Sequence, residues 1–122
     1  MTTRLAVISL WAADVPQAAH FYRDVIGLRL IPHHAGGRPH FDLGGAYLTL
    51  LAGRPRPAAA AQPENFPVVA FAVDDLEAAR ARLDAHGVAQ PWGVEAEAGA
   101  RWVKFYDPAG NLIELVQFGE AP

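Results

Sequence analysis

The chain has 122 residues, a length typical of a single domain, and 52% of its residues are apolar, enough for a sizeable core. Its formal net charge is -3, without runs of like charges, which argues against nucleic acid or an anionic membrane surface as a partner. No cysteine is present, so disulfides, thiolate metal sites and a cysteine nucleophile are excluded. No signal-peptide pattern or bilayer-spanning apolar run is found, so we expect a soluble cytoplasmic protein.

The first half of the chain predicts a strand, a helix and three further strands. Residues 5–12 alternate in polarity like a half-buried strand. Asp14 is a good N-cap for a helix that runs to about residue 25, and Gly27 is a good C-cap. Turn glycines then separate three strand candidates. These candidates cover residues 28–32, 38–43 and 46–51. We therefore expect a β-α-β-β-β module over residues 4–52.

The second half repeats this order after a Pro- and Ala-rich linker over residues 53–65. Asp74 or Asp75 caps the predicted helix, and Gly87 ends it. The turn Asp107–Asn111 predicts a hairpin between the last two strands. The strand candidates are residues 68–73, a segment near 88–91, 101–106 and 112–118. The second module spans residues 66–119, and both modules together form one expected domain, residues 1–122.

The two halves match in detail. Val7 stands seven residues before Asp14, and Val68 stands seven residues before Asp75. The residue four positions after the turn glycine is Thr49 in the first half and Glu114 in the second half. An internal repeat of this length is informative about the fold. It predicts an α+β protein of two tandem modules, with Val7, Thr49, Val68 and Glu114 at equivalent positions.

Glu114 is the residue in this pattern that most clearly indicates a site. It lies in a predicted strand between Ile113 and Leu115, and burying a lone carboxylate is costly. It needs a metal, a cationic partner or solvent. Alternation places Lys104 on the matching face of the neighbouring strand, within reach of Glu114 across an antiparallel pair. Lys104 is therefore a candidate cationic partner, and the alternative is that both side chains face water.

Four segments together resemble the vicinal oxygen chelate superfamily, which includes glyoxalase I, bleomycin-resistance proteins, fosfomycin-resistance proteins and extradiol dioxygenases. They are Ala13–Val15, Phe21–Leu28, Phe71–Leu76 and Asp107–Leu115. The resemblance covers nearly the whole chain. It implies two modules whose curled, mixed sheets enclose a pocket, and it implies dimerisation, so we expect a homodimer.

In metal-using members of this superfamily, the ligand positions would match Val7, Thr49, Val68 and Glu114 of this chain. Glu114 is a credible ligand, Thr49 is a poor one, and the two valines cannot coordinate a metal. A catalytic divalent site needs about three protein ligands. We therefore expect no cofactor, and a bound divalent metal is the alternative.

The resemblance also implies which side chains face the pocket. The expected wall is largely apolar and aromatic, with few polar groups, which suits an organic ligand. The alternative is that the aromatic residues only fill the core. The expected ligand-binding residues are Val7, Ser9, Trp11, Tyr47, Thr49, Val68, Trp102, Lys104, Leu112 and Glu114.

Histidines allow a second kind of site. His40 and Asp42 share a strand face, and such a pair can orient a general base. His40 can also bind a metal together with Glu114, in an arrangement that departs from the family pattern. The simpler expectation is that His33 and His34 are exposed loop residues and that His40 lies at a strand edge.

Three functions follow from these observations. The first is metal-independent binding or sequestration of a small, largely apolar organic molecule, as in the bleomycin-resistance branch. The second is a lyase, isomerase or dioxygenase with an unusual metal site that includes Glu114. The third is a metal-free enzyme that uses Glu114 as a general base, with a pKa raised by apolar surroundings. We do not expect bleomycin itself to be the ligand. A bleomycin-binding protein should have a strongly acidic surface, and the net charge of this chain is only mildly negative.

Overall fold

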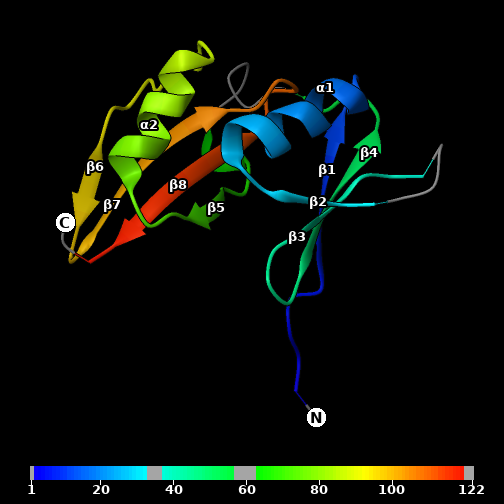
Figure 1. The fold of residues 1–122 in the computed structure, drawn as a ribbon, viewed down its shortest axis with the longest axis horizontal. Helices are drawn as coiled ribbons and strands as arrows, with labels where there is room; N and C mark the ends of the chain where they lie inside the picture. The colour runs from blue at the N-terminus through cyan, green and yellow to red at the C-terminus, as the bar shows by residue number, and fades with distance from the viewer. Residues whose placement is uncertain (1, 33–36, 57–62, 120–122) are drawn as a thin grey trace. The chain divides into compact units, whose positions relative to one another are not determined.

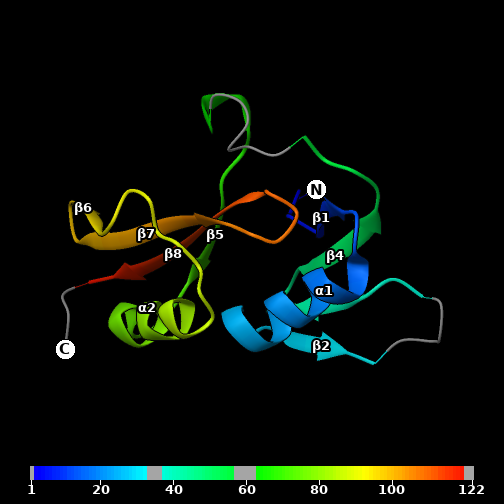
Figure 2. The same cartoon turned by 90° about the horizontal axis from the view of Figure 1, so that it is seen from above.

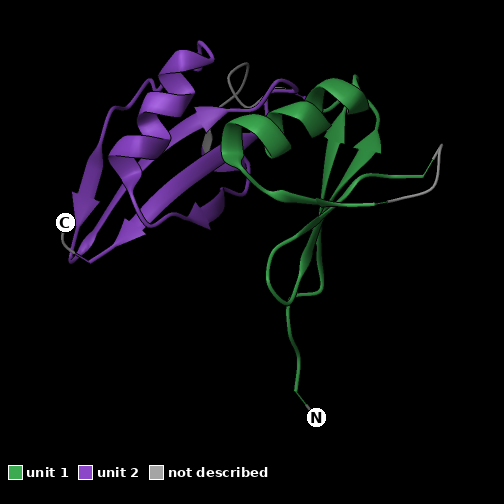
Figure 3. Cartoon of the chain, viewed as in Figure 1, with its two compact units in different colours: residues 1–55 green, residues 56–122 purple. Residues whose placement is uncertain are grey.

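The structure of this chain is a computed structural model that describes residues 2–32, 37–56 and 63–119. The chain divides into two compact units, residues 1–55 and 56–122, drawn in green and purple in Figure 3. His33, His34 and the middle of the predicted linker lie outside the described residues. Packing of both units as a single domain stays a prediction. In the described ranges, no helix has the length and apolar character needed to cross a membrane.

Unit 1 folds in the order predicted from the sequence (Figure 1). Its elements are β1 (Val7–Ala12), α1 (Val15–His20), the π-helical segment η1 (Phe21–Ile26), β2 (Arg29–Ile31), β3 (His40–Asp42) and β4 (Tyr47–Ala52). The strand order in the sheet is β1-β4-β3-β2. Strand β1 pairs with β4 in parallel, and the other pairs are antiparallel. Because η1 continues α1, helical backbone reaches Ile26.

Local signals fix both ends of the helical segment in unit 1. The Asp14 carboxylate accepts a hydrogen bond from the Gln17 N–H at 3.0 Å, as expected of an N-cap. A proline in the first turn needs no hydrogen-bond acceptor there. Gly27 ends the segment with φ of 87°, a left-handed conformation that favours glycine. Both predicted ends are confirmed.

Unit 2 repeats the same order, and its helix is α-helical throughout. Its elements are η3 (Pro63–Asn65), β5 (Val69–Ala72), α2 (Leu76–Ala85), β6 (Glu95–Glu97), β7 (Ala100–Tyr106) and β8 (Leu112–Phe118). The strand order is β5-β8-β7-β6, and β5 pairs with β8 in parallel. The Asp75 carboxylate caps α2 by accepting from the Ala78 N–H at 3.1 Å. The predicted hairpin of β7 and β8 is confirmed.

One strand prediction was wrong. Residues 88–91 form no strand, and the edge strand comes later, as β6. The side chain of Gln90, in this segment, is hydrogen-bonded to α2 instead. Gln90 accepts a hydrogen bond from Arg80 at 3.1 Å and donates one to Asp84 at 2.8 Å. These bonds hold the segment along the helix, and the chain reaches the edge of β7 only at Glu95.

The register of the strands confirms the internal repeat. In unit 1, Thr49 of β4 pairs with Ser9 of β1, and in unit 2, Glu114 of β8 pairs with Ala70 of β5. Val7 and Val68 each lie two residues before these partners, on the same side of their strands. The fold class is therefore confirmed as α+β, with two β-α-β-β-β modules and a mixed sheet in each.

Each sheet has one face packed against its own helix, as the views of Figures 1 and 2 agree. In unit 1, Tyr22 and Phe41 are fully buried on that side, with ring centroids 6.1 Å apart. In unit 2, the fully buried residues of the helix side are Leu76, Leu83, Val103, Phe105 and Ile113. We call the opposite side of each sheet the helix-free face. Strand alternation sends every second residue there.

The turn between β7 and β8 rests on Asp107, which is only 5% exposed. Its carboxylate accepts hydrogen bonds from the Ala109 N–H at 3.0 Å, the Asn111 N–H at 2.8 Å and the Asn111 side-chain amide at 3.0 Å. Gly110 supplies the positive φ of 91° that the turn requires. The turn thereby sets the register in which Lys104 faces Glu114.

We predict that Asp107→Ala lowers the free energy of unfolding by about 1–3 kcal/mol, because three partly buried N–H donors lose their acceptor. Urea unfolding followed by circular dichroism measures the change. Asp74→Ala, at an exposed carboxylate one residue before the cap of α2, is the control and should stay within about 0.5 kcal/mol of the wild type. Equal effects of the two substitutions would contradict this role of the turn.

Candidate functional site

The helix-free face of unit 2 carries a compact group of charged and aromatic side chains. Register places Lys104 of β7 directly opposite Glu114 of β8, and Trp102 of β7 opposite Glu95 of β6. All four residues are partly exposed. The helix side of the same strands is fully buried and apolar at Val103. The sheet therefore separates a packed apolar side from a face that solvent and small molecules can reach.

Lys104 lies between two carboxylates. Its ammonium Nζ is 3.2 Å from Glu95 Oε1, so these side chains form an ion pair, and both are about one quarter to one third exposed, at 25% and 35%. Glu95 Oε1 is itself shielded from solvent, and no donor among the described residues reaches it with hydrogen-bond geometry. The contact is therefore one of charge at short distance. Glu114 faces the same ammonium as its cross-strand neighbour.

The pKa of Glu114 is raised above its ordinary value, chiefly because burial in the sheet disfavours the charged form. The positive charge of Lys104 opposes this shift, and the negative charge of Glu95 adds to it. Folding therefore makes Glu114 a weaker acid. Its charge disfavours the folded state increasingly as the pH rises from the unfolded pKa through the folded pKa, and it has no such effect at lower pH.

Aromatic rings border this charged group. Trp92, in the segment before β6, is 39% exposed, and its ring lies 5.8 Å from that of Tyr106 with a tilt of 53°. The Lys104 ammonium lies 5.0 Å from the centroid of the Trp92 ring, which is the range of a cation–π contact. The Lys104 ammonium thus contacts both the Glu95 carboxylate and the Trp92 ring.

Trp92 and Glu95 are site residues that the sequence reasoning missed. The sequence predicts the edge strand near residues 88–91, whereas the observed strand β6 is Glu95–Glu97, so Glu95 had no predicted position on the sheet. Residues 94–98 alternate apolar and acidic residues, but strand β6 itself is Glu-Ala-Glu, and both residue types are depleted in strands. A signal did exist, because a second acid near the last hairpin could have been weighed as a partner for Lys104.

The helix-free face of unit 1 gathers the other predicted site residues. Val7, Ser9 and Trp11 of β1 lie there and are exposed, with Val7 at 46% and Trp11 at 51%. Register places Tyr47, which is 44% exposed, opposite Val7, and Thr49 opposite Ser9. The predicted residues of unit 1 therefore share one face, as alternation requires. Their counterparts in unit 2, which include Val68 and Leu112, belong to the second sheet.

Thr49 and His40 are engaged within unit 1. The Thr49 hydroxyl is buried and donates a hydrogen bond to the Pro39 carbonyl at 2.9 Å. His40 Nδ1 lies 2.9 Å from the Arg38 carbonyl, and since a carbonyl only accepts, Nδ1 carries the proton. In the neutral ring, Nε2 is then the free acceptor. His40 and Thr49 are cross-strand partners, as Lys104 and Glu114 are in unit 2.

The predicted orienting pair of His40 and Asp42 is not formed in this structure. One carboxylate oxygen of Asp42 accepts from the Gly44 N–H at 2.8 Å, and the other accepts from Arg29 Nη1 at 3.4 Å. Among the hydrogen bonds of the described residues, none joins His40 to Asp42. The acid therefore stabilises the β3–β4 turn and the edge strand β2, and it does not hold the histidine ring.

Trp11 also lines a pocket at the ends of β1 and β4. This pocket has a volume of about 470 Å³, and Arg38, Pro39 and Leu51 contribute to its wall. The Trp11 ring lies against Gly53, where an added Cβ would come within 2.7 Å of the ring. A glycine at this position therefore leaves room for the tryptophan ring next to the end of β4.

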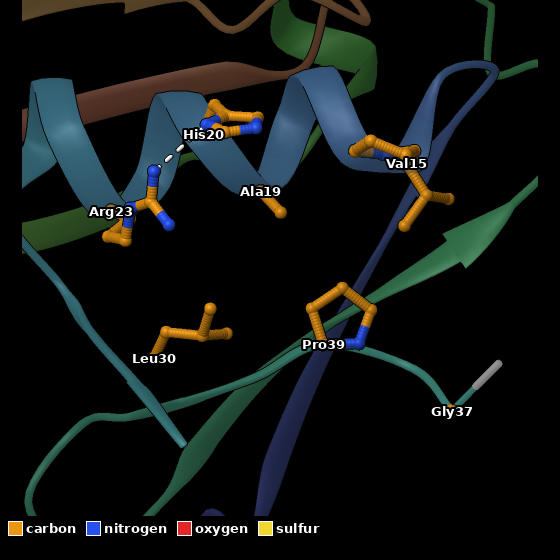
Figure 4. A pocket seen from close by; sticks show the side chains of 8 residues that line it. Val15, Ala19, His20, Arg23, Leu30, Gly37 and Pro39 are labelled. Carbon is orange, nitrogen blue, oxygen red and sulfur yellow. Dashed lines mark hydrogen bonds between the residues drawn. The ribbon is translucent and has the colours of Figure 1, made fainter. Parts of the chain in front are cut away.

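A smaller pocket of about 270 Å³ lies between α1 and β2 (Figure 4). Figure 4 shows Ala19 and Leu30 facing it, with His20 and Arg23 at its rim. Arg23 donates to both carboxylate oxygens of Asp24, and this arrangement holds the pKa of Asp24 below its ordinary value. The cation is thereby neutralised, and this pocket shares no residue with the predicted site.

The comparisons with known proteins agree with this geometry. The family model described as the Glyoxalase/Bleomycin resistance protein/Dioxygenase superfamily matches residues 4–115. The structure is similar to that of a lactoylglutathione lyase from Agrobacterium tumefaciens, with 25% identity, a TM-score of 0.72 and coverage of 96% of this chain and 95% of that chain. The chain belongs to the Glyoxalase/Bleomycin resistance protein/Dioxygenase superfamily.

Two further solved structures are similar over nearly their whole length. TnmS3, an antibiotic-binding protein from Streptomyces sp. CB03234, has 25% identity and a TM-score of 0.72, with 97% of this chain and 98% of that chain covered. An integron cassette protein from V. cholerae has 26% identity and a TM-score of 0.73, with 98% of each chain covered. A comparison with curated proteins gives no match.

The metal site implied by the superfamily does not fit the donors present. Of the four matching positions, Val7 and Val68 have no ligand atom, and the Thr49 hydroxyl is buried and bound to a backbone carbonyl. Glu114 alone offers a carboxylate, and its cross-strand neighbour is the cationic side chain of Lys104. Within the described residues, no three His, Asp or Glu side chains gather in a group that could hold a metal ion.

We predict that Lys104→Met raises the pKa of Glu114 further, because the ammonium charge favours the ionised carboxylate. The pH dependence of the Glu114 carboxyl carbon chemical shift measures this change. Arg101→Met is the matched control, since Arg101 faces the helix side and donates to Gln117 at 3.3 Å. An unchanged Glu114 titration in Lys104→Met would show that the ammonium is not its electrostatic partner.

Proposed function

We propose that this protein binds and sequesters a small, largely apolar organic molecule, without a metal ion, on the helix-free faces of its sheets. One observation carries the proposal: these faces and their rims hold large apolar side chains that stay exposed in the folded chain. They are Val7 at 46%, Trp11 at 51%, Tyr47 at 44%, Val68 at 44% and Trp92 at 39%. Exposed apolar groups with a few polar groups among them are typical of ligand-binding surfaces.

The relatives are consistent with this proposal, although they differ in activity. One similar structure is an antibiotic-binding protein, and another is a lactoylglutathione lyase. The residues of this chain favour the binding role, because three of the four positions used by metal-dependent members lack an available ligand atom. As the family resemblance implies, we also propose that the protein is a homodimer, and we propose separately that it is cytoplasmic.

A metal-free acid–base enzyme is the second candidate, and Glu114 is the observation that favours it. Burial raises the pKa of this carboxyl, and a general base works best when its pKa lies near the working pH. Turnover of a bound ligand that disappears in Glu114→Gln would support this candidate. Binding that continues in Glu114→Gln without any turnover would support the sequestration role.

The proposal is tested with phenylnaphthylamine, a neutral aromatic probe whose fluorescence rises in apolar surroundings. We expect saturable binding that survives dialysis against a chelator, and we expect Trp92→Ala to weaken it roughly threefold to tenfold, the scale of one aromatic contact. Leu5→Ala, which removes a 62% exposed apolar side chain before β1, is the control and should leave the affinity unchanged. Absence of binding, or binding that is lost on chelation, would contradict the proposal.

A further inference from the structure

The charges on the helix-free face of unit 2 are unbalanced. Glu95, Glu97 and Glu114 have their strand positions on this face, and Lys104 is the one cationic side chain among its described residues. Three carboxylates against one ammonium leave a net charge of -2 when all are ionised. The nearby cation Arg101 lies on the helix side, within 4.0 Å of Glu77 of α2. An apolar, aromatic face with this excess of negative charge favours a positively charged partner.

Lys104 shows how this face holds a cation. Its ammonium lies 3.2 Å from a Glu95 oxygen and 5.0 Å from the centroid of the Trp92 ring. This pairing of an acid with an aromatic ring is repeated by Glu114 and Tyr106. Tyr106 lies two residues from Lys104 on β7, so it is the diagonal cross-strand neighbour of Glu114. Lys104 forms its ion pair with Glu95, and Glu114 forms no ion pair within 4.0 Å among the described residues.

We infer that the ligand of the helix-free face of unit 2 is an organic cation, an apolar or aromatic frame that bears a protonated amine. The frame would contact the rings of Trp92 and Tyr106, and the amine would bind the Glu114 carboxylate. This inference rests on the proposed function and adds the class of ligand. A neutral ligand would gain the ring contacts alone, and an anion would meet the three carboxylates of this face, whose single ammonium is already paired.

Partial burial makes the charge count for more than it would on an open surface. Glu114 is partly buried, and its pKa is raised chiefly by that burial, so a cation placed beside it would be screened less than in bulk water. A ligand amine would also relieve the unfavourable charge of Glu114. We therefore expect binding of the cation to lower the pKa of Glu114.

The inference is tested with three compounds that share one tricyclic frame and differ in charge. They are the 9-amino isomer of aminoacridine, which is a cation at neutral pH, neutral acridone, and the acridinecarboxylate anion. Quenching of tryptophan fluorescence reports binding. We expect aminoacridine to bind about tenfold more tightly than acridone, which corresponds to about 1.4 kcal/mol, and the anion to bind more weakly than either.

Variants separate the charge of this face from the charge of the whole protein. Glu114→Gln should weaken aminoacridine binding roughly threefold to tenfold and leave acridone binding unchanged, which also shows that the variant is folded. Lys104→Met should strengthen aminoacridine binding. Glu77→Gln removes an equal charge on the helix side and should leave the preference for the cation unchanged.

Two outcomes would overturn the inference in distinguishable ways. If acridone binds the wild type as tightly as aminoacridine, or if Glu77→Gln weakens the cation as much as Glu114→Gln, the ligand class is wrong while the proposed function stands. If none of the three compounds binds, the proposed function itself fails, and the inference fails with it.

Discussion

Burial of one side of each sheet is the constraint on which the candidate site depends. In unit 2, Val103, Phe105 and Ile113 are fully buried on the helix side. Because side chains alternate along a strand, this burial sends Lys104 and Glu114 to the opposite face, and the Asp107 turn fixes which residues of the two strands face one another. A shift of one residue would bury both charges and expose the core, so the fold and the site are set by the same packing.

A single lysine then organises the chemistry of that face. Its ammonium forms an ion pair with Glu95, interacts electrostatically with Glu114 and lies over the Trp92 ring. Among the positions that metal-dependent members of the superfamily use, Glu114 is the one that carries a carboxylate in this chain. The positive charge next to it comes from a side chain of the protein, Lys104.

Local and periodic signals predicted most of the fold. Capping by Asp14, the left-handed Gly27 and the alternation of β7 and β8 each depend on neighbouring residues, so the sequence alone sufficed. The repeat gave the correct register of Thr49 and Glu114. The missed features depend on long-range pairing. Strand β6 consists of residue types that are depleted in strands, and it forms by pairing with β7. The sequence offered Glu95 as an acid near the last hairpin, but its place opposite Trp102 depends on that long-range pairing.

The central claim is that the helix-free face of unit 2 is a binding surface, and a proton–nitrogen correlation spectrum recorded during titration with aminoacridine tests it most directly. We expect the indole N–H signals of Trp92 and Trp102 to shift together with the amides of β7 and β8. The amides of the exposed side of α2 should stay in place. Shifts confined to α2, with both indole signals unmoved, would show that the ligand binds elsewhere than on this face.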